Sequence, residues 1–401
     1  MEFKKYKLNE VLTLNPTLKL KKNTIAKKIS MENIKEYQKK IDSYTYSEFK
    51  SGSKFMNGDT LLARITPCLE NGKTAYVDIL DEDEIAFGST EFFVLRPKDN
   101  LMDSHFLYYL MRTNELRSTI IKSMTGTSGR QRAQKESILE YEFCLPSLKI
   151  QTAIAKLLKN FDDKIETNKK IIANLEELSQ TLFKRWFVDF EFPDENGNPY
   201  KSSGGDMVES ELSKIPKSWK VDTLGNYIKI KSGKRPKCKV DNKDFENVVP
   251  VIGASKIMGY TNDYIYNEKI IIIGRVGTHG VIQRFSTRTW PSDNTFVITS
   301  DFESIIYQLL KSIDYISLNR GSTQPLLSQK DIKNTKVAMP TNETLLYKYQ
   351  NENDHILKMM DQKNIENQKL AQLRDTLLPK LMSGEIEIPD DIEVMEDELS
   401  I

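Results

Sequence analysis

The sequence contains short segments whose residue types could do chemistry, but none of them completes a catalytic motif. Residues 72–74, Gly-Lys-Thr, resemble the end of a phosphate-binding loop, yet Pro67 stands where the first glycine of that loop belongs. Residues 274–280 are rich in glycine but do not follow the dinucleotide-binding spacing. The three histidines and three cysteines are too dispersed to indicate a metal site or a Cys/His catalytic pair. We therefore predict no catalytic activity, no metal site and no cofactor in this chain alone.

Basic and amide side chains in or beside glycine-containing loops are a second kind of candidate. Arg or Lys can bond both acceptors of guanine, and Asn or Gln can bond adenine, each such pair contributing about 1–3 kcal/mol against the wrong base. In the first half of the chain these residues are Arg64, Lys73, Thr127, Ser128, Arg130, Gln131 and Arg132. In the second half they are Lys234, Arg235, Arg275, Thr278, His279, Asn294, Arg320, Ser322, Thr323 and Gln324. The alternative for each is a solvated loop side chain or one that stabilises a turn.

The charge that nucleic-acid binding requires is masked by a balance within the chain. The 401 residues carry a net charge of +1, which as a whole-chain figure argues against a nucleic-acid binder. Residues 385–401 hold eight acidic and no basic residues, so residues 1–384 carry +9. Residues 211–340 hold 20 basic and 12 acidic residues (+8), whereas residues 1–145 hold 23 and 20 (+3). The basic excess therefore lies in the second half, densest around Gly233, where the alternative to a phosphate-binding loop is a solvated basic loop.

Hydropathy places no part of the chain in a membrane. The mean hydropathy is −0.50, and no apolar run approaches the roughly 20 residues that a bilayer span needs. The first residues, Met-Glu-Phe-Lys-Lys, lack the apolar stretch of a signal peptide. We expect a cytoplasmic protein, with residues 385–401 forming a disordered, solubilising acidic tail.

Internal similarity indicates a tandem repeat. Gly126-Thr127 recurs as Gly321-Ser322, and Ala133-Gln134-Lys135 recurs as Ser328-Gln329-Lys330, in each case 195 residues later (321 minus 126, 328 minus 133). A slip of one residue then matches Pro146 with Pro340. The starts of the halves also resemble each other, residues 6–9 matching residues 219–222. The predicted order is a globular domain, a long helix, a linker, a second globular domain and a second long helix.

Each globular part reads as a mixed α/β domain. Runs of β-branched and aromatic residues bounded by Gly, Asn or Pro predict strands at residues 59–64, 92–95, 248–252, 270–273 and 295–298. Helical spacing predicts one helix over residues 104–122 and its counterpart over residues 302–313. Residues 192–205 are rich in Gly, Ser and Pro, which predicts an exposed, flexible linker.

Two heptad seams give the clearest periodic signal. The first runs through Ile154, Leu158, Phe161, Ile165, Asn168, Ile172, Leu175 and Leu182, and the second through Ile356, Met360, Asn367, Leu370 and Leu377. Asn168 and Asn367 interrupt the apolar seams, a substitution that typically fixes register and partner. We predict that the two helices pair as an antiparallel coiled coil, with intermolecular pairing and ordinary core helices as the alternatives.

The predicted fold class is therefore α+β, with two mixed domains in tandem and two long helices between them. We place the first domain at residues 1–146, its helix at 147–190 and the linker at 191–210. The second domain follows at residues 211–340, its helix at 341–384 and the acidic tail at 385–401.

The repeated segments, taken together, resemble a known family. They are residues 133–135, 145–146, 175–178, 182–190, 321–328 and 373–386. In this combination and order, the chain resembles the specificity (S) subunits of type I restriction-modification systems over essentially its whole length. The first copy departs from the pattern, because residues 129–132 read Gly-Arg-Gln-Arg where the second copy has Gln324-Pro325-Leu326.

The resemblance implies a non-catalytic subunit whose two target-recognition domains each read one half of a split site in double-stranded DNA. It also implies that the paired helices form a spacer of fixed length and bind two methyltransferase subunits, which bring S-adenosylmethionine and methylate adenine. Endonuclease and translocase subunits, with ATP and Mg²⁺, complete the restriction enzyme, so those cofactors belong to the partners. Two other classes are kept as alternatives: an enzyme with a hidden nuclease or methyltransferase site, and a coiled-coil structural adaptor that ignores DNA.

Overall fold

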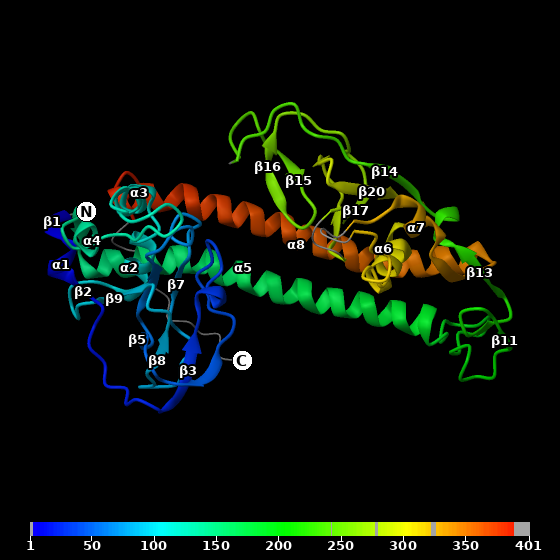
Figure 1. Ribbon diagram of the computed structural model, residues 1–401, viewed down its shortest axis with the longest axis horizontal. Coiled ribbons are helices and arrows are strands. Elements are labelled where there is room, and N and C mark those ends of the chain that lie inside the picture. The colour runs from blue at the N-terminus through cyan, green and yellow to red at the C-terminus, as the bar shows by residue number, and fades with distance from the viewer. Residues whose placement is uncertain (1–2, 242, 277–279, 322–325, 389–401) are drawn as a thin grey trace. The chain divides into compact units, whose positions relative to one another are not determined.

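The computed structural model describes residues 3–241, 243–276, 280–321 and 326–388. These residues form two compact units (Figure 1). Unit 1 comprises the described residues of Met1–Thr167 and Glu366–Ile401, and unit 2 those of Asn168–Ile365. Two long helices, α5 (Leu148–Phe183) and α8 (Glu343–Ser383), contribute residues to both units. No helix in the described part of the chain is long and apolar enough to cross a membrane.

Unit 1 contains two four-stranded sheets, and an antiparallel pair of strands joins the two ends of its domain. The pair is β1 (Phe3–Lys7) with β10 (Glu142–Pro146). The first sheet has the order β2 (Leu12–Leu14), β9 (Phe92–Pro97), β6 (Thr60–Ala63), β7 (Thr74–Tyr76). The second has the order β4 (Thr45–Glu48), β3 (Ile25–Ile29), β8 (Ala86–Gly88), β5 (Ser53–Phe55). Its short helices are α1 (Leu8–Val11), η1 (Met31–Asn33), α2 (Ser104–Leu110), α3 (Asn114–Lys122) and α4 (Lys135–Leu139).

Unit 2 repeats much of this plan. Its closing pair is β13 (Trp219–Thr223) with β21 (Lys336–Pro340), and β11 (Met207–Glu209) with β12 (Lys214–Pro216) forms a hairpin. One sheet has the order β14 (Lys229–Ser232), β20 (Thr295–Thr299), β17 (Ile270–Gly274), β18 (Ile282–Phe285). The other has the order β16 (Ile257–Thr261), β15 (Val249–Ile252), β19 (Trp290–Pro291). Its other helical elements are the π turn η2 (Lys184–Val188), η3 (Leu224–Asn226), α6 (Glu303–Ser312) and α7 (Gln329–Asn334).

In unit 1, α5 and α8 pair across a buried ion pair. The Arg374 guanidinium donates to the Asp162 carboxylate, and both side chains are only 7% exposed. The Tyr109 hydroxyl of α2 donates to the other Asp162 oxygen at 2.6 Å. Lys164 lies 3.9 Å from Glu366, so the residue numbers run in opposite directions along the two helices. The helix segments are therefore antiparallel, and α2 of the globular part is bound to the same carboxylate.

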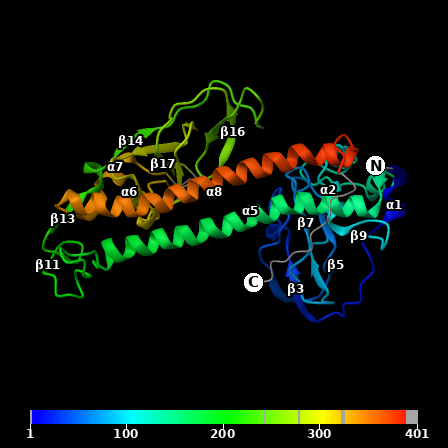
Figure 2. The ribbon, with the colours of Figure 1, turned by 180° about the vertical axis from the view of Figure 1, so that it is seen from behind.

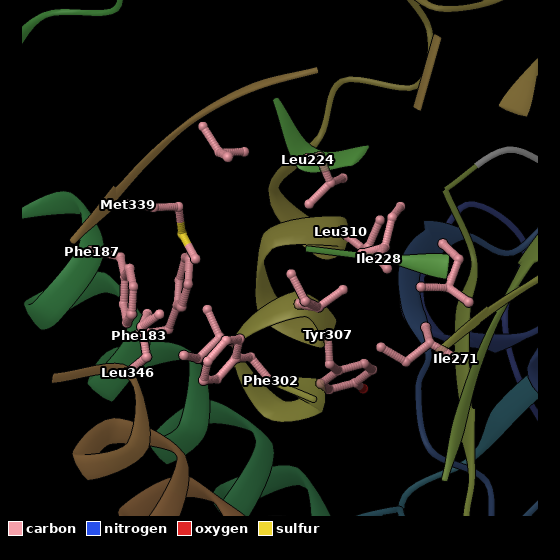
Figure 3. Close-up of a cluster of buried hydrophobic side chains, with 14 of the residues drawn as sticks. Phe183, Phe187, Leu224, Ile228, Ile271, Phe302, Tyr307, Leu310, Met339 and Leu346 are labelled. Atoms are coloured by element: carbon pink, nitrogen blue, oxygen red, sulfur yellow. The ribbon is translucent and has the colours of Figure 1, made fainter. Parts of the chain in front are cut away.

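In unit 2, neutral hydrogen bonds take the place of that ion pair. The buried Ser179 hydroxyl of α5 donates to Oδ1 of Asn353 on α8 at 2.7 Å, and Gln308 of α6 donates to Ser179 at 2.7 Å. Around them lies the main core of the unit, in which Phe183 and Phe187 stack at 5.0 Å and face Met339 and Leu346 (Figure 3). Both views of the ribbon show α5 and α8 side by side (Figure 2). The predicted antiparallel pairing is confirmed as a contact within one chain.

Burial along the seams largely follows the predicted period. Ile154, Leu158, Ile165, Asn168 and Met360 are buried, whereas Phe161, Ile172, Leu175, Leu182, Ile356, Asn367, Leu370 and Leu377 are half-buried. On α8 the prediction missed Asn353, Leu357 and Leu378, which are 0%, 1% and 5% exposed. Globular elements pack against α8 as well as α5, so its buried surface is wider than a two-helix seam.

The single helix predicted over residues 104–122 is wrong, because the chain forms α2 and α3 with a break between them. Thr113 has an extended backbone (φ −61°, ψ 139°), and its hydroxyl donates to the Leu110 carbonyl at 2.8 Å. The Thr113 hydroxyl thus bonds a carbonyl of the last turn of α2, and Thr113 directly precedes α3. This arrangement interrupts the helical hydrogen bonds but leaves the apolar periodicity intact. The counterpart α6 and the five predicted strands are confirmed.

The segment predicted as an exposed linker is folded in the structure. Phe192 is 5% exposed and stacks between Tyr200 (4.7 Å between ring centroids) and Trp219 (5.5 Å). The Tyr200 amide also donates to the Phe192 carbonyl at 2.9 Å. β11 lies within the predicted linker range as well. Aromatic packing therefore buries Phe192 and holds the segment in a defined fold, while residues 195–198 and 201–204 are exposed as predicted.

The prediction of a disordered acidic tail is also wrong for its first residues. Ile388 is 7% exposed and belongs to the core of unit 1, and Ile386 packs against the same core. The Ile386 amide donates to the Lys380 carbonyl at 3.1 Å, after Gly384 has turned the chain at φ +77°. Residues 389–401, which hold most of the predicted tail, lie outside the described residues.

We predict that Asp162→Ala lowers the free energy of unfolding of unit 1 by about 3–5 kcal/mol, because it leaves Arg374 buried without its main counter-charge. Urea denaturation followed by fluorescence measures this change. Asp163→Ala is the matched control, since Asp163 forms an exposed i,i+4 pair with Lys159 worth about 0.5 kcal/mol or less. Equal effects of the two substitutions would contradict the assignment.

We also predict a pH dependence that originates at His105. Its imidazole packs on Tyr76 with centroids 4.1 Å apart, and burial, then the nearby Lys39, lowers the His105 pKa to about 4. Since the unfolded chain takes up this proton near pH 6.5, the free energy of unfolding falls as the pH decreases from 6.5 towards 4. Denaturation at pH 7, 5.5 and 4.5 should show a shallower decrease for His105→Phe; parallel curves for the two proteins would exclude His105 as the origin.

Candidate nucleic-acid interface

In unit 1, two adjacent strands of one sheet bring together an arginine and a glutamate. β6 and β9 pair so that Ala63 lies opposite Phe92. Arg64 therefore leaves β6 next to Glu91, which enters β9, and the Arg64 amide donates to the Glu91 carbonyl at 3.0 Å. The Arg64 guanidinium also lies over the Phe93 ring, 5.6 Å from its centroid. The sheet thus fixes both the backbone and the side chain of Arg64 at its edge.

The Glu91 carboxylate joins this arginine to a second one. Arg132 donates to both carboxylate oxygens, with its shortest contact at 2.7 Å, and Arg64 Nε donates to Oε2 at 3.1 Å. These hydrogen bonds, first from Arg132 and then from Arg64, hold the Glu91 pKa below its usual range. The Glu91 side chain is 21% exposed and the two arginines 33% and 44%, so the three charged groups form one cluster at the surface.

The predicted glycine-containing loop lies beside this cluster. Thr125 and Arg132 exchange backbone hydrogen bonds of 3.0 and 2.9 Å, and the Thr66 amide donates to the Gln131 carbonyl at 3.0 Å. Between the two ends of the loop, Thr127, Ser128 and Arg130 are exposed. The structure therefore brings together Arg64, Thr127, Ser128, Arg130, Gln131 and Arg132.

Unit 2 builds the same geometry from different residues. β17 and β20 pair so that Gly274 lies opposite Thr295, and the Arg275 amide donates to the Asn294 carbonyl at 2.8 Å. The Arg275 guanidinium lies 5.9 Å from the centroid of the Phe296 ring. Asn294 is exposed, and within the described residues no carboxylate pairs with Arg275. Arg64, Glu91 and Phe93 of unit 1 thus correspond to Arg275, Asn294 and Phe296 of unit 2.

The basic segment around Gly233 lies next to this position. A Cβ atom at Gly233 would meet the Ser292 carbonyl oxygen at 2.1 Å, so only glycine allows the close approach. Arg235, Lys237 and Lys239 line a cavity of about 530 Å³ together with Asn294. Lys234 is exposed, and its backbone amide donates to the Pro291 carbonyl at 2.9 Å, which places it beside the same strand. The structure therefore brings Lys234, Arg235, Arg275 and Asn294 to one region.

Two further predicted residues also have partners within the protein. Lys73 Nζ donates to the Met31 carbonyl at 2.8 Å, and Arg320 pairs with Asp331. Thr278, His279, Ser322, Thr323 and Gln324 lie outside the described residues.

Sequence reasoning missed Glu91, although a signal for it exists. Glu91-Phe92-Phe93-Val94 aligns with Asn294-Thr295-Phe296-Val297, and this alignment matches Glu91 with a predicted site residue. The two positions are the same in the structure, since each carbonyl accepts from the amide of the arginine after the neighbouring strand. Glu91 could therefore have been found from its equivalence to Asn294 in the other copy of the repeat. A search for basic and amide side chains alone does not find it.

Comparison with known proteins decides the family. A model of the "Type I restriction modification DNA specificity domain" matches residues 1–177 and 216–375. The chain belongs to the type I restriction-modification DNA specificity family. The two matched segments correspond to the two copies of the repeat.

Named relatives agree with this assignment. The chain is 30% identical over 328 residues to the MjaIX type I restriction enzyme specificity subunit of Methanocaldococcus jannaschii, covering 73% of this chain and 71% of the relative. It is 25% identical over 411 residues to the HindI specificity subunit of Haemophilus influenzae, covering 82% and 86%. The crystal structure of an S subunit from M. genitalium superposes with a TM-score of 0.57 at 20% identity, covering 97% of both chains. The structural similarity supports the fold, and membership of the family identifies the chain as a specificity subunit.

Proposed function

We propose that each unit of this specificity subunit reads one half of a bipartite, asymmetric site in double-stranded DNA. The observation that carries the proposal is the duplicated edge: an arginine stacked on phenylalanine, beside a polar residue at the end of the neighbouring strand, occurs once in each unit. Guanidinium, carboxylate and amide groups at exposed strand ends are suited to base edges in the major groove. Different polar residues at the two edges account for two different half-sites.

The long helices, in this proposal, fix the separation of the half-sites and bind two methyltransferase subunits. Their antiparallel pairing within each unit is supported by the Asp162–Arg374 ion pair and by the Ser179–Asn353 hydrogen bond. S-adenosylmethionine, ATP and Mg²⁺ then belong to the methyltransferase and restriction subunits, and this chain contributes recognition without catalysis. The competing function, a structural adaptor that ignores DNA, leaves the duplicated edges without a role.

Co-expression with two methyltransferase subunits, followed by mapping of the methylated adenines, tests the proposal. The expected result is methylation within a split sequence whose two halves differ. An assembled complex that binds duplex DNA without sequence preference, or does not bind it, would favour the adaptor.

We predict that Arg275→Ala relaxes the sequence preference of one half-site only. Loss of a bidentate contact of about 1–3 kcal/mol corresponds to a decrease of roughly fivefold to 150-fold in discrimination at one base pair. Arg288→Ala is the matched control, because Arg288 also stacks on an aromatic ring, that of Tyr264 at 4.9 Å, without a corresponding position in the duplicated edge. Methylation mapping reads both halves, and an equal loss at the two would contradict a division of recognition between two units.

We also predict that lengthening both helices changes the spacing between half-sites. Insertion of seven residues after Thr167 in α5 and after Ile365 in α8 preserves the heptad period and adds about 10 Å of helix. At about 3.4 Å per base pair, the preferred spacer should grow by about three base pairs. The same insertion in α5 alone is the control, because it disturbs the register of the antiparallel contacts. An unchanged spacer in the double insertion would show that the helices do not set it.

A further inference from the structure

The duplicated edge has one position at which the two units differ in chemistry. This position is occupied by Glu91 in unit 1 and by Asn294 in unit 2, each directly before its strand and two residues before the phenylalanine under the arginine. A carboxylate only accepts hydrogen bonds, whereas an amide both donates and accepts. Substitution at an equivalent position therefore changes what the edge can recognise while the backbone around it stays the same.

The neighbouring loop differs in a matching way. In unit 1, the Ala133 amide donates to the Arg64 carbonyl at 2.8 Å, and in unit 2 the Leu327 amide donates to the Arg275 carbonyl at 3.0 Å. The preceding residues, Arg132 and Leu326, are therefore equivalent, as their bridges to Ile65 and Val276 also indicate. The unit that carries the glutamate has an arginine to pair with it, and the unit that carries the asparagine has a leucine.

The two arginines of unit 1 keep the carboxylate ionised and immobile. Arg132 donates to both oxygens and Arg64 donates to Oε2, and a planar guanidinium that contacts both oxygens restrains the carboxylate in rotation as well as in position. The net charge of the arrangement is +1 in each unit: two arginines and one glutamate against one arginine and a neutral amide. At this position, therefore, the two units differ in hydrogen-bonding character and not in the net charge of the side chains compared.

We propose that the residue at this position determines the preferred base at one base pair of each half-site, an inference that rests on the proposed reading of DNA by the two units. Glu91 accepts a hydrogen bond from the exocyclic amino group of a base in the major groove, cytosine N4 or adenine N6. Asn294 pairs with adenine through its amide oxygen and nitrogen. Arg64 and Arg132 are positioning residues for Glu91, and they act on the base through it.

The test uses the complex of this chain with its methyltransferase subunits and maps the methylated sites. Glu91→Asn combined with Arg132→Leu gives unit 1 the residues of unit 2 and keeps the net charge at +1. The expected result is a change of preference at one base pair of one half-site, with the original base disfavoured by tenfold or more and the other half-site unchanged. The identity of the original base, cytosine or adenine, distinguishes the two sources of the amino group.

Further variants separate base reading from masking of charge. If Glu91 only neutralised the arginines, Glu91→Gln would tighten binding to all sequences and steepen its salt dependence without changing the preferred base, and that result would overturn the proposal. We expect instead a loss of discrimination at the same base pair, and a partial return of it in Glu91→Asp. For Arg132→Gln we expect weaker discrimination at that pair. Arg132→Lys should restore it only in part, because lysine lacks the planar pair of donors that fixes the orientation of a carboxylate.

A reciprocal variant in unit 2 guards against a folding defect in unit 1. Asn294→Glu should change one base pair of the other half-site, because Asn294 is exposed and its backbone contact does not depend on its side chain. Unchanged preferences in folded complexes of both variants would overturn the inference while leaving the proposed function intact. Failure of the wild-type complex to methylate any split site would instead refute the proposed function.

Discussion

Both units depend on the antiparallel contact between α5 and α8, because each unit contains a segment of both helices. An ion pair as deeply buried as Asp162–Arg374 contributes little net stability over an apolar pair of the same size, since both charges lose their hydration. Its stronger effect is on other registers of the two helices: a shift of α8 by one turn would separate Arg374 from Asp162 and leave the buried Asp162 carboxylate without this counter-charge. The contact therefore selects one register, and the Tyr109 hydroxyl extends that selection from the helices to the globular part of unit 1.

In unit 2, the hydrogen bond between α5 and α8 is neutral. Ser179, Asn353 and Gln308 form a neutral chain of hydrogen bonds between α5, α8 and α6, and a mismatch there costs an unsatisfied polar group and not an unpaired charge. A second connection uses Arg284 of β18, which donates to Asp361 of α8 at 2.6 and 2.9 Å and also pairs with Glu303 of α6. Sheet, short helix and long helix are thus joined through one guanidinium. In unit 2, these contacts connect the sheet that carries the candidate interface to α8, and in unit 1 they connect α2 to the long helices.

The general plan followed from the sequence, but the alignment of its repeats did not. Apolar periodicity and β-branched runs predicted the long helices and five of the strands, because burial on one face is a local pattern. The match of Ala133-Gln134-Lys135 with Ser328-Gln329-Lys330 is off by one residue, since Gln134 and Ser328 both precede their helices and Ala133 corresponds to Leu327. The match between residues 6–9 and 219–222 is likewise displaced. Phe3 pairs with Pro146 of β10 and Trp219 with the equivalent Pro340 of β21, so Trp219 corresponds to Phe3. Hydrogen-bond register, which depends on partners distant in sequence, decides equivalence where letter similarity cannot.

Charge shows the same limit, because its sum along a segment says little about its arrangement. Residues 1–145 carry only +3, which by itself indicates a weak attraction to phosphate. Within that segment the structure gathers two arginines around one glutamate, so much of the local positive charge is used in holding a carboxylate at the surface. Long-range attraction depends on net charge, whereas discrimination between bases depends on the direction of individual donors and acceptors. A modestly charged unit can therefore be selective provided that other parts of an assembled complex hold the phosphates, and the basic segment of unit 2, from Lys229 to Lys239, is suited to that role within this chain.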